Sequence, residues 1–319
     1  MIRKKFLIDE LKEGAAVDDV FVVKIKRSVE AYAKGFLFSL IISDKSGKSL
    51  DYRYWGSSDY AAVKALYDTI EQDSIVRIQG KVGAYNGKLQ LTTNAPMTIV
   101  PVPEGEFDVS DFVPRTKKNI DEMYKKVQTA IDSVSNPKIK QLLFHVFADM
   151  GELFKQGPAA IEIHHNWIGG LLEHTVQVLE VVLVSAEQFN LNKDLVIAGA
   201  LLHDIGKLKE LKITTRIRAD DLAQLNGHLV IGATYVDNEC QKIGMDEETR
   251  AKIVHLIVAH HGHLEYGSPK EPMFPEALAV YLADELSCKL AEMQGFIAST
   301  DTTDKFAYSK RNNRNIFLG

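Results

Sequence analysis

Hydrophobic and polar residues alternate along the first hundred residues in the manner of β-strands. Five segments between Val17 and Val100 are rich in β-branched and aromatic residues, and the turn sequences DKSGK and YNGK each separate two of them. Between the third and fourth segments, residues 57–70 have a Ser cap and an apolar stripe at helical spacing. Three strands, one helix and two strands in this order predict an OB-fold, a small all-β barrel of five strands.

The hydrophobic pattern changes after this region. Residues 101–118 contain three prolines and several acidic residues without periodicity, which predicts a linker. From residue 119 the apolar positions follow helical spacing, and we expect helices over 120–134, 137–154, 170–189, 193–207, 228–243, 246–261 and 275–294. The chain is therefore predicted to be multidomain, with an OB-fold at 1–100, a linker at 101–118, an all-α domain at 119–298 and a basic C-terminal tail at 299–319.

Composition limits the class of protein. With 319 residues, 45% hydrophobic and 25% charged, the chain can form two globular domains. No apolar stretch approaches the roughly 18 residues that span a bilayer, and the N-terminus turns polar too early for a signal peptide, so we expect a cytoplasmic protein without a membrane partner. The two cysteines are too few for a disulfide framework, so a metal site would have to use His and Asp.

Charge and histidine are unevenly distributed. The net charge is -5, yet residues 1–110 are balanced, with 15 basic and 15 acidic side chains. This argues against a nucleic-acid coat protein but leaves room for local basic patches. All ten histidines lie between His145 and His263, so the candidate chemistry belongs to the helical part.

Several of these polar residues stand where a helix should be apolar. Asp284 shares a helix face with Ala277, Val280 and Cys288, and an unpaired carboxylate buried there would be costly. His203 and Asp204 end a nearly continuous apolar helix, and His174 interrupts another. A single such histidine is more often a core residue than a ligand, but the coincidence on three helices, together with His228 and the pair His260 and His261, predicts a metal site. We expect His145, His255 and His263 to be structural or exposed.

These residues resemble a known signature. His174, the pair His203 and Asp204, and Asp284 are similar to the four ligands of the HD superfamily of metal-dependent phosphohydrolases, over about residues 160–295. With an OB-fold placed before them, the motifs HHNWIGGLLEHT, LLHDIGK, GHLVIG, AHHGHLEYGSPKEP and EALAVYLADEL resemble the YhaM-type 3'-5' exoribonucleases over nearly the whole chain.

The resemblance implies roles for individual residues. His174, His203 and Asp284 would hold one divalent ion, His228, His260 and His261 a second, and Asp204 would bridge the two. The ions implied are Mn²⁺ first, with Fe²⁺, Mg²⁺ or Zn²⁺ as alternatives. Lys207 would approach a phosphate oxygen, although a lysine at a surface helix end would look the same in sequence. The implied reaction is hydrolysis of single-stranded RNA, with single-stranded DNA as a second candidate, to nucleoside 5'-monophosphates by metal-activated water.

The barrel offers the residue types that hold single strands. OB-folds use a basic groove and aromatic platforms, and the candidates here are Lys24, Lys26, Phe36, Phe38, Tyr54, Trp55 and Lys88. Tyr52 and Tyr54 should share one strand face and Arg53 and Trp55 the other, but the sequence leaves open which face is outward. The competing interpretation is that most of the aromatics fill the barrel.

Two other functions use the same features. An HD-type phosphodiesterase or nucleotidase for small cyclic nucleotides would share the metal site. Against it, Gly262 to Ser268 follow the histidine pair, where the cyclic-dinucleotide branch has Gly-Tyr-Pro. A noncatalytic single-strand-binding protein with structural metals would explain neither Lys207 nor the surplus of ligands. No oligomeric state is predicted.

Overall fold

The computed structural model describes residues 1–161 and 165–319, and these form two compact units. The first consists of Met1–Pro114 with Thr214–Arg216, and the second of Arg115–Ile213 with Ile217–Gly319. His164, the first residue of the HHNW motif, lies outside the described residues. Among the helices of the described residues, none has the length and apolar character needed to cross a bilayer.

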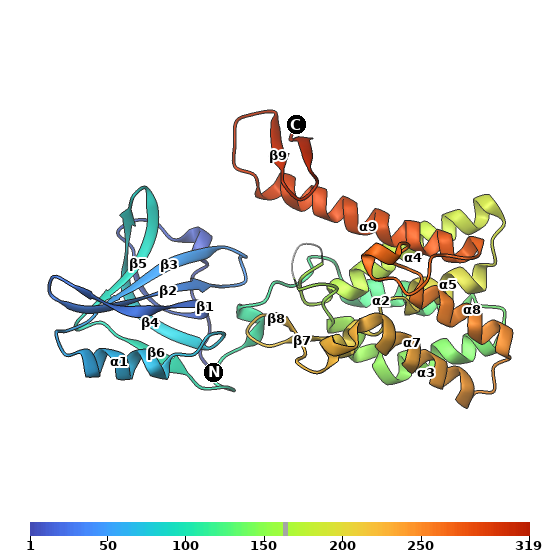
Figure 1. Ribbon diagram of the computed structural model, residues 1–319, viewed down its shortest axis with the longest axis horizontal. Helices are drawn as coiled ribbons and strands as arrows, with labels where there is room; N and C mark the ends of the chain where they lie inside the picture. The colour runs from blue at the N-terminus through green and yellow to red at the C-terminus, as the bar shows by residue number, and fades with distance from the viewer. Residues whose placement is uncertain (162–164) are drawn as a thin grey trace. The chain divides into compact units, whose positions relative to one another are not determined.

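The first unit is a closed barrel (Figure 1). Its elements are β1 (Ala16–Tyr32), β2 (Gly35–Ser43), β3 (Ser49–Trp55), α1 (Tyr60–Thr69), β4 (Ile75–Tyr85), β5 (Lys88–Asn94) and β6 (Ile99–Val102). The strand order is β1-β2-β3-β5-β4, and the long β1 pairs with β4 as well as β2, which closes the five strands into a barrel. Only β3 and β5 pair in parallel among these strands. The predicted OB-type fold is confirmed.

The barrel interior is filled by large apolar side chains, among them Phe21, Phe38 and Tyr52, all fully buried. Helix α1 contributes Val63 to this core. The helix begins at Tyr60 rather than near Ser57, because the side chain of Asp59 caps it by accepting a hydrogen bond from the Ala62 amide.

The residues expected as a linker are partly folded onto the barrel unit. Strand β6 extends β4 to Val102, and Phe107 and Phe112 pack edge to face beside the buried Val20. Asp111 forms an ion pair with Arg3. The prolines and acidic residues interrupt the hydrophobic periodicity, so the sequence predicted a linker here. The packing of Phe107 and Phe112 could not be predicted from that pattern.

The second unit is helical, and the predicted all-α domain is confirmed. Its helices are α2 (Ile120–Asp132), α3 (Pro137–Gln156), α4 (Gly170–Phe189), α5 (Lys193–Leu202), α6 (Lys207–Glu210), α7 (Gly227–Lys242), α8 (Glu247–Val258) and α9 (Pro275–Ser299). Two short strands, β7 (Leu211–Ile213) and β8 (Ile217–Ala219), form a hairpin after α6. Asparagine caps start three helices by accepting backbone amide hydrogen bonds, at Asn119, Asn136 and Asn192.

Helix α5 is the central element of this unit. All its residues from Leu195 to Leu202 are buried, which explains why its sequence is apolar on every side. The helix predicted to continue to Lys207 stops at Leu202, and a turn carries His203 and Asp204 before α6 begins. Similarly, α8 ends at Val258, so His260 and His261 lie in the turn that follows it. Four of the candidate ligands, His203, Asp204, His260 and His261, therefore lie in turns that follow helices.

The C-terminal segment forms a hairpin in place of the predicted basic tail. Strands β9 (Phe306–Ser309) and β10 (Arg314–Phe317) pair antiparallel after α9 (Figure 1). Ser309 and Ile316 are buried, and Arg311 forms an ion pair with Glu292 of α9 at 3.0 Å. This packing holds the hairpin against its own unit.

Candidate metal centre

The first cluster of candidate ligands joins three helices of the second unit. His174 from α4 and His203 from the end of α5 point their Nε2 atoms at each other at 3.1 Å. Asp284 of α9 places Oδ1 3.1 Å from the same nitrogen of His174, and Asp204 Oδ2 lies 3.6 Å from it. His174 and His203 are almost completely buried. Four ligand atoms from distant parts of the chain thus face one small space.

The second cluster consists of three histidines near Oδ1, the other carboxylate oxygen of Asp204. His228, at the start of α7, places Nε2 3.7 Å from Asp204 Oδ1, and His260 places Nε2 3.5 Å from the same oxygen. His261 faces His228 with 3.3 Å between their Nε2 atoms. The Asp204 carboxylate therefore lies between two groups of three side chains each, with one oxygen toward each group.

Two atoms of this arrangement are buried without a hydrogen-bond partner, Asp204 Oδ1 and His260 Nε2. A polar atom left in this state costs on the order of 1–3 kcal/mol, and more for a charged one. A bound cation would satisfy both atoms. The donor set of imidazole nitrogen and carboxylate oxygen suits Mn²⁺, Fe²⁺, Zn²⁺ and Mg²⁺. The residues present therefore fit divalent metal binding.

The electrostatics of the cluster keep the ligand atoms available. Burial raises the pKa of Asp204, but the charges of Lys207 and His203 outweigh burial and hold this pKa well below its usual value. Burial likewise raises the pKa of Asp284, and His174 reverses the shift to well below the usual value. For His260, burial lowers the pKa to about 4. Both carboxylates are therefore ionised and the His260 ring is neutral at neutral pH.

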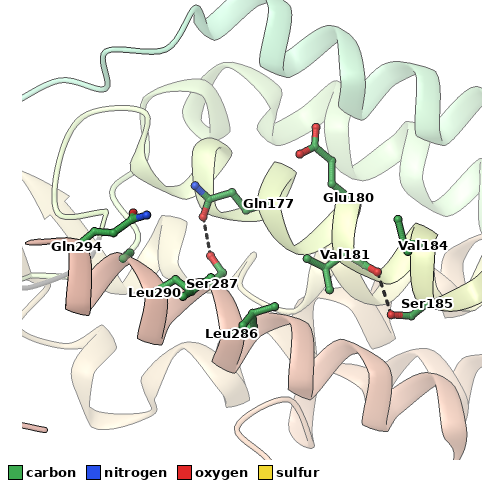
Figure 2. A pocket seen from close by; sticks show the side chains of 10 residues that line it. Gln177, Glu180, Val181, Val184, Ser185, Leu286, Ser287, Leu290 and Gln294 are labelled. Carbon is green, nitrogen blue, oxygen red and sulfur yellow. Dashed lines mark hydrogen bonds between the residues drawn. The ribbon is translucent and has the colours of Figure 1, made fainter. Parts of the chain in front are cut away.

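The rings are oriented by hydrogen bonds on their other nitrogen. Ser287 Oγ donates to Gln177 Oε1 at 2.7 Å, so the same hydroxyl can accept from His174 Nδ1, which lies 3.0 Å away. Figure 2 shows Gln177 and Ser287 facing each other across a groove between α4 and α9. This relay orients the His174 ring with Nε2 directed toward the cluster, and a metal bound there would select the tautomer with its proton on Nδ1.

The other four histidines have an equivalent partner at Nδ1. These partners are the Ala200 carbonyl for His203, Glu210 for His228, the Ile257 carbonyl for His260 and the Tyr266 carbonyl for His261, at 2.7–3.1 Å. Glu210 is the only side-chain carboxylate among them, and a carboxylate raises the basicity of the ring that it contacts. Glu210, Ser287 and Gln177 carry no sequence signal that the motif spacing could reveal.

Lys207 is placed inside the centre and not at the surface. Its Nζ donates to Asp204 Oδ2 at 2.7 Å, from the first residue of α6. Burial lowers the pKa of Lys207, but Asp204 and Asp284 outweigh burial and raise it above the usual value. The side chain is therefore a fixed positive charge beside the bridging carboxylate.

Other candidate residues lie apart from these clusters. His255 Nε2 accepts from the Met273 amide, and His263 lies 3.5 Å from Glu271, as expected for structural or exposed histidines. Cys288 was not predicted, yet its Sγ lies 3.4 Å from Asp284 Oδ1. Burial raises the pKa of Cys288 strongly, so without a bound metal the group is a thiol, and together with His174 and Asp284 its sulfur could also contact a cation.

The barrel residues predicted to contact nucleic acid divide into two sets. Phe38 is fully buried and stacks on Tyr54 at 4.9 Å, so the prediction that Phe38 stacks on a base is wrong. Lys26 donates to the Tyr67 and Ile70 carbonyls at the end of α1, so its ammonium group caps the C-terminal end of this helix. Phe36 packs edge to face on Tyr60.

The outward strand face is the one with Arg53 and Trp55. The Arg53 guanidinium lies over the Trp55 ring at 5.3 Å and over the Tyr85 ring at 5.9 Å, and Tyr32 packs against Trp55. Lys24 and Lys88 are exposed. The sequence placed Arg53 on the same strand face as Trp55 without deciding which face is outward, and Tyr85 was absent from the predicted set.

The chain is similar to known proteins over most of its length. A family model for the HD domain matches residues 171–288. The chain is 31% identical to a curated protein of Halalkalibacterium halodurans named 3'-5' exoribonuclease YhaM, over 88% of this chain and 85% of that protein. A protein of the same name from Bacillus velezensis is also 31% identical, over 88% and 87%. Among solved structures, the OB domain of a Thermoplasma acidophilum protein aligns with 30% of this chain and 85% of its own at 16% identity and a TM-score of 0.24.

Proposed function

Since this chain belongs to the family of 3'-5' exoribonucleases named YhaM, we propose that it removes nucleotides from the 3' end of single-stranded RNA. The chain is a phosphodiester hydrolase with an HD domain. The observation that carries the proposed chemistry is the Asp204 carboxylate, whose two oxygens face two separate groups of histidine and aspartate side chains.

Seven residues would hold two divalent ions. His174, His203 and Asp284 form the first site, His228, His260 and His261 the second, and Asp204 contributes one oxygen to each. Divalent ions bound there would acidify a water molecule and offset charge on the scissile phosphate. Mn²⁺ is our first candidate, as the family resemblance implies, and the same ligands also suit Fe²⁺, Zn²⁺ and Mg²⁺.

The protein's own groups supply orientation and charge. The Nδ1 hydrogen bonds of the five histidines hold each ring so that Nε2 faces inward. Lys207 keeps the Asp204 carboxylate ionised and places a positive charge where a phosphate oxygen would approach. With water as the nucleophile, the reaction needs no covalent intermediate and releases nucleoside 5'-monophosphates.

The direct test uses two blocked oligoribonucleotides with the purified protein and Mn²⁺. We expect the substrate blocked at its 5' end to be degraded to 5'-monophosphates and the one blocked at its 3' end to survive, as read on one denaturing gel. Degradation of only the 3'-blocked substrate would show that the enzyme digests RNA from its 5' end. Loss of cyclic dinucleotides alone would show a small-nucleotide phosphodiesterase instead.

RNA would contact the outward face of the barrel sheet. The strand register places Arg27, Ser39, Arg53, Thr92 and Lys81 side by side across β1, β2, β3, β5 and β4. Trp55 and Tyr85 flank Arg53 in this row. A basic row with aromatic rings beside it is the combination that binds single strands. Single-stranded DNA offers the same backbone and bases, so we include it as a second substrate.

Replacing one ring tests this face. We expect Trp55→Ala to raise KM for a 20-nucleotide RNA by roughly tenfold, because a lost base stack weakens binding by about 1–3 kcal/mol. Hydrolysis of bis-p-nitrophenyl phosphate, which has no nucleotide strand to lie along the barrel face, should stay within twofold. Phe6→Ala, which removes another exposed ring of the same unit, is the matched control and should change neither. Equal losses on both substrates would assign Trp55 a purely structural role.

A further inference from the structure

The C-terminal hairpin, residues 306–317, exposes an aromatic face. Phe306 pairs with Phe317 across the two strands, and their ring centroids lie 5.2 Å apart. Tyr308 pairs with Asn315, so all four side chains share one face of the hairpin. The three rings are 55–59% exposed although each lies in a hydrogen-bonded strand. Aromatic side chains of this size rarely face solvent together unless they have a binding role.

The opposite face explains why the rings cannot turn inward. Ser309 and Ile316, which point the other way, are buried, and Arg311 at the hairpin tip is tied to Glu292 of α9. The Tyr308 hydroxyl donates to Asn313 Oδ1 at 2.6 Å, which fixes this ring relative to the tip. The aromatic face is therefore held outward by the packing of its back.

The hairpin is also basic. Residues 305–319 contain Lys305, Lys310, Arg311 and Arg314 and no acidic side chain. This contrasts with the rest of the chain, whose net charge is negative. A protein partner with an apolar surface would need the rings but not this charge, whereas a polyanion with flat bases would use both.

We propose that the C-terminal hairpin is a second contact site for single-stranded RNA, in which bases stack on Phe306, Tyr308 and Phe317 while Lys310 and Arg314 contact phosphates. This inference rests on the proposed function and deepens it by adding a substrate contact within the helical unit. The site requires no bound ion, and its chemistry is that of the strand-binding platforms of other folds.

The length of α9 defines how much RNA is needed to reach the hairpin. Glu292 lies eight residues after the candidate ligand Asp284, and the helix ends fifteen residues after it, at Ser299. At about 1.5 Å per residue these positions are roughly 12 and 22 Å along the helix from Asp284. With about 3.4 Å per stacked nucleotide, a strand covers this in roughly four to seven nucleotides. Substrates shorter than this should not depend on the hairpin.

The experiment compares a 20-nucleotide and a 3-nucleotide RNA with the intact, metal-loaded protein. The variant combines Phe306→Ala with Phe317→Ala, and Phe189→Ala, an exposed ring at the end of α4, is the matched control. We expect KM for the 20-mer to rise roughly 10- to 100-fold, with KM and kcat for the 3-mer within twofold of wild type. A second variant, Lys310→Gln with Arg314→Gln, should reduce the salt dependence of 20-mer binding without affecting the 3-mer.

Each other outcome would overturn the inference. An unchanged KM for the 20-mer would show that the hairpin does not contact the substrate, and equal losses on both RNAs would show a structural role. Loss of 20-mer binding together with a change of molar mass in light scattering would assign the rings to contact between proteins. If wild type hydrolyses neither RNA, the proposed function fails, while fluorescence anisotropy of the labelled 20-mer still tests the hairpin.

Discussion

Replacing Asp204 by Ala is expected to abolish hydrolysis of both RNA and a small phosphodiester. The two oxygens of this carboxylate face one candidate site each, and Oδ1 is buried without a hydrogen-bond partner. Removing it would deprive both proposed ions of a ligand at once. We expect turnover to fall by roughly three orders of magnitude or more, because both the positioning of the water and the charge stabilisation depend on the ions.

Two measurements and two further variants separate loss of metal from loss of fold. Elemental analysis of anaerobically purified Asp204→Ala should give less metal per chain than wild type, while anisotropy with a labelled RNA should still detect binding. Asp204→Asn keeps the shape without the charge and should be equally inactive. Asp132→Ala, which removes an exposed aspartate at the end of α2, should behave as wild type. Full activity of Asp204→Ala with unchanged metal content would refute the bridge.

The fold class could be predicted because periodicity depends on the side of an element that is buried. Alternation specified the barrel strands, and the apolar stretch before His203 marked the central helix. The sequence predicted the positions of helix ends less accurately. The expected helix through Lys207 stops at Leu202, since no local residue in this apolar run signals the turn that presents His203 and Asp204.

The candidate ligands could be found for a related reason. Asp284 and His203 stand at positions where burial of a polar group needs compensation, and the sequence alone shows that conflict. Groups that orient the ligands show no such conflict. Ser287, Gln177 and Glu210 are ordinary polar residues in their helices. Only the three-dimensional contacts place Ser287 at Nδ1 of His174 and Glu210 at Nδ1 of His228, with Gln177 accepting from Ser287.

In the barrel, the alternation of side chains along a strand does not show which face lies inside. Two faces of a strand carried aromatic residues, and sequence alone could not decide that Phe38 and Tyr52 fill the interior while Trp55 lies on the outer face. That choice depends on closure of the sheet, which is a property of the whole barrel.

Gly206 is a further residue that the motifs left unexplained, and we expect Gly206→Ala to damage the centre severely. A Cβ at this position would lie 2.0 Å from the His228 carbonyl oxygen and 2.8 Å from the Gly232 amide nitrogen. Both neighbours are backbone atoms of α7, so neither can move aside as a flexible side chain would. The backbone angles of Gly206 are helical and open to alanine, so the obstacle is space and not conformation.

Relief of this contact requires α7 to shift away from the turn that carries Asp204. His228 opens α7 and belongs to the second cluster, so the shift separates it from the bridging carboxylate. We expect the free energy of unfolding of the helical unit to fall by about 2 kcal/mol or more, and its thermal midpoint by several degrees. Activity should fall at least a hundredfold, even at temperatures where the variant is folded, because misplacement of a ligand by about 1 Å has effects of this size.

Gly295→Ala is the matched control, since nothing lies within 4 Å of a Cβ at that position in α9. Alanine in a helix favours the folded state over glycine by roughly 0.5–1 kcal/mol, so this variant should be as stable as wild type or slightly more stable, with unchanged activity. Differential scanning calorimetry and turnover of bis-p-nitrophenyl phosphate measure both effects. Equal stability and activity of Gly206→Ala and Gly295→Ala would contradict this prediction. That result would show that α7 tolerates displacement, and that its close contact with the turn after α5 does not position His228.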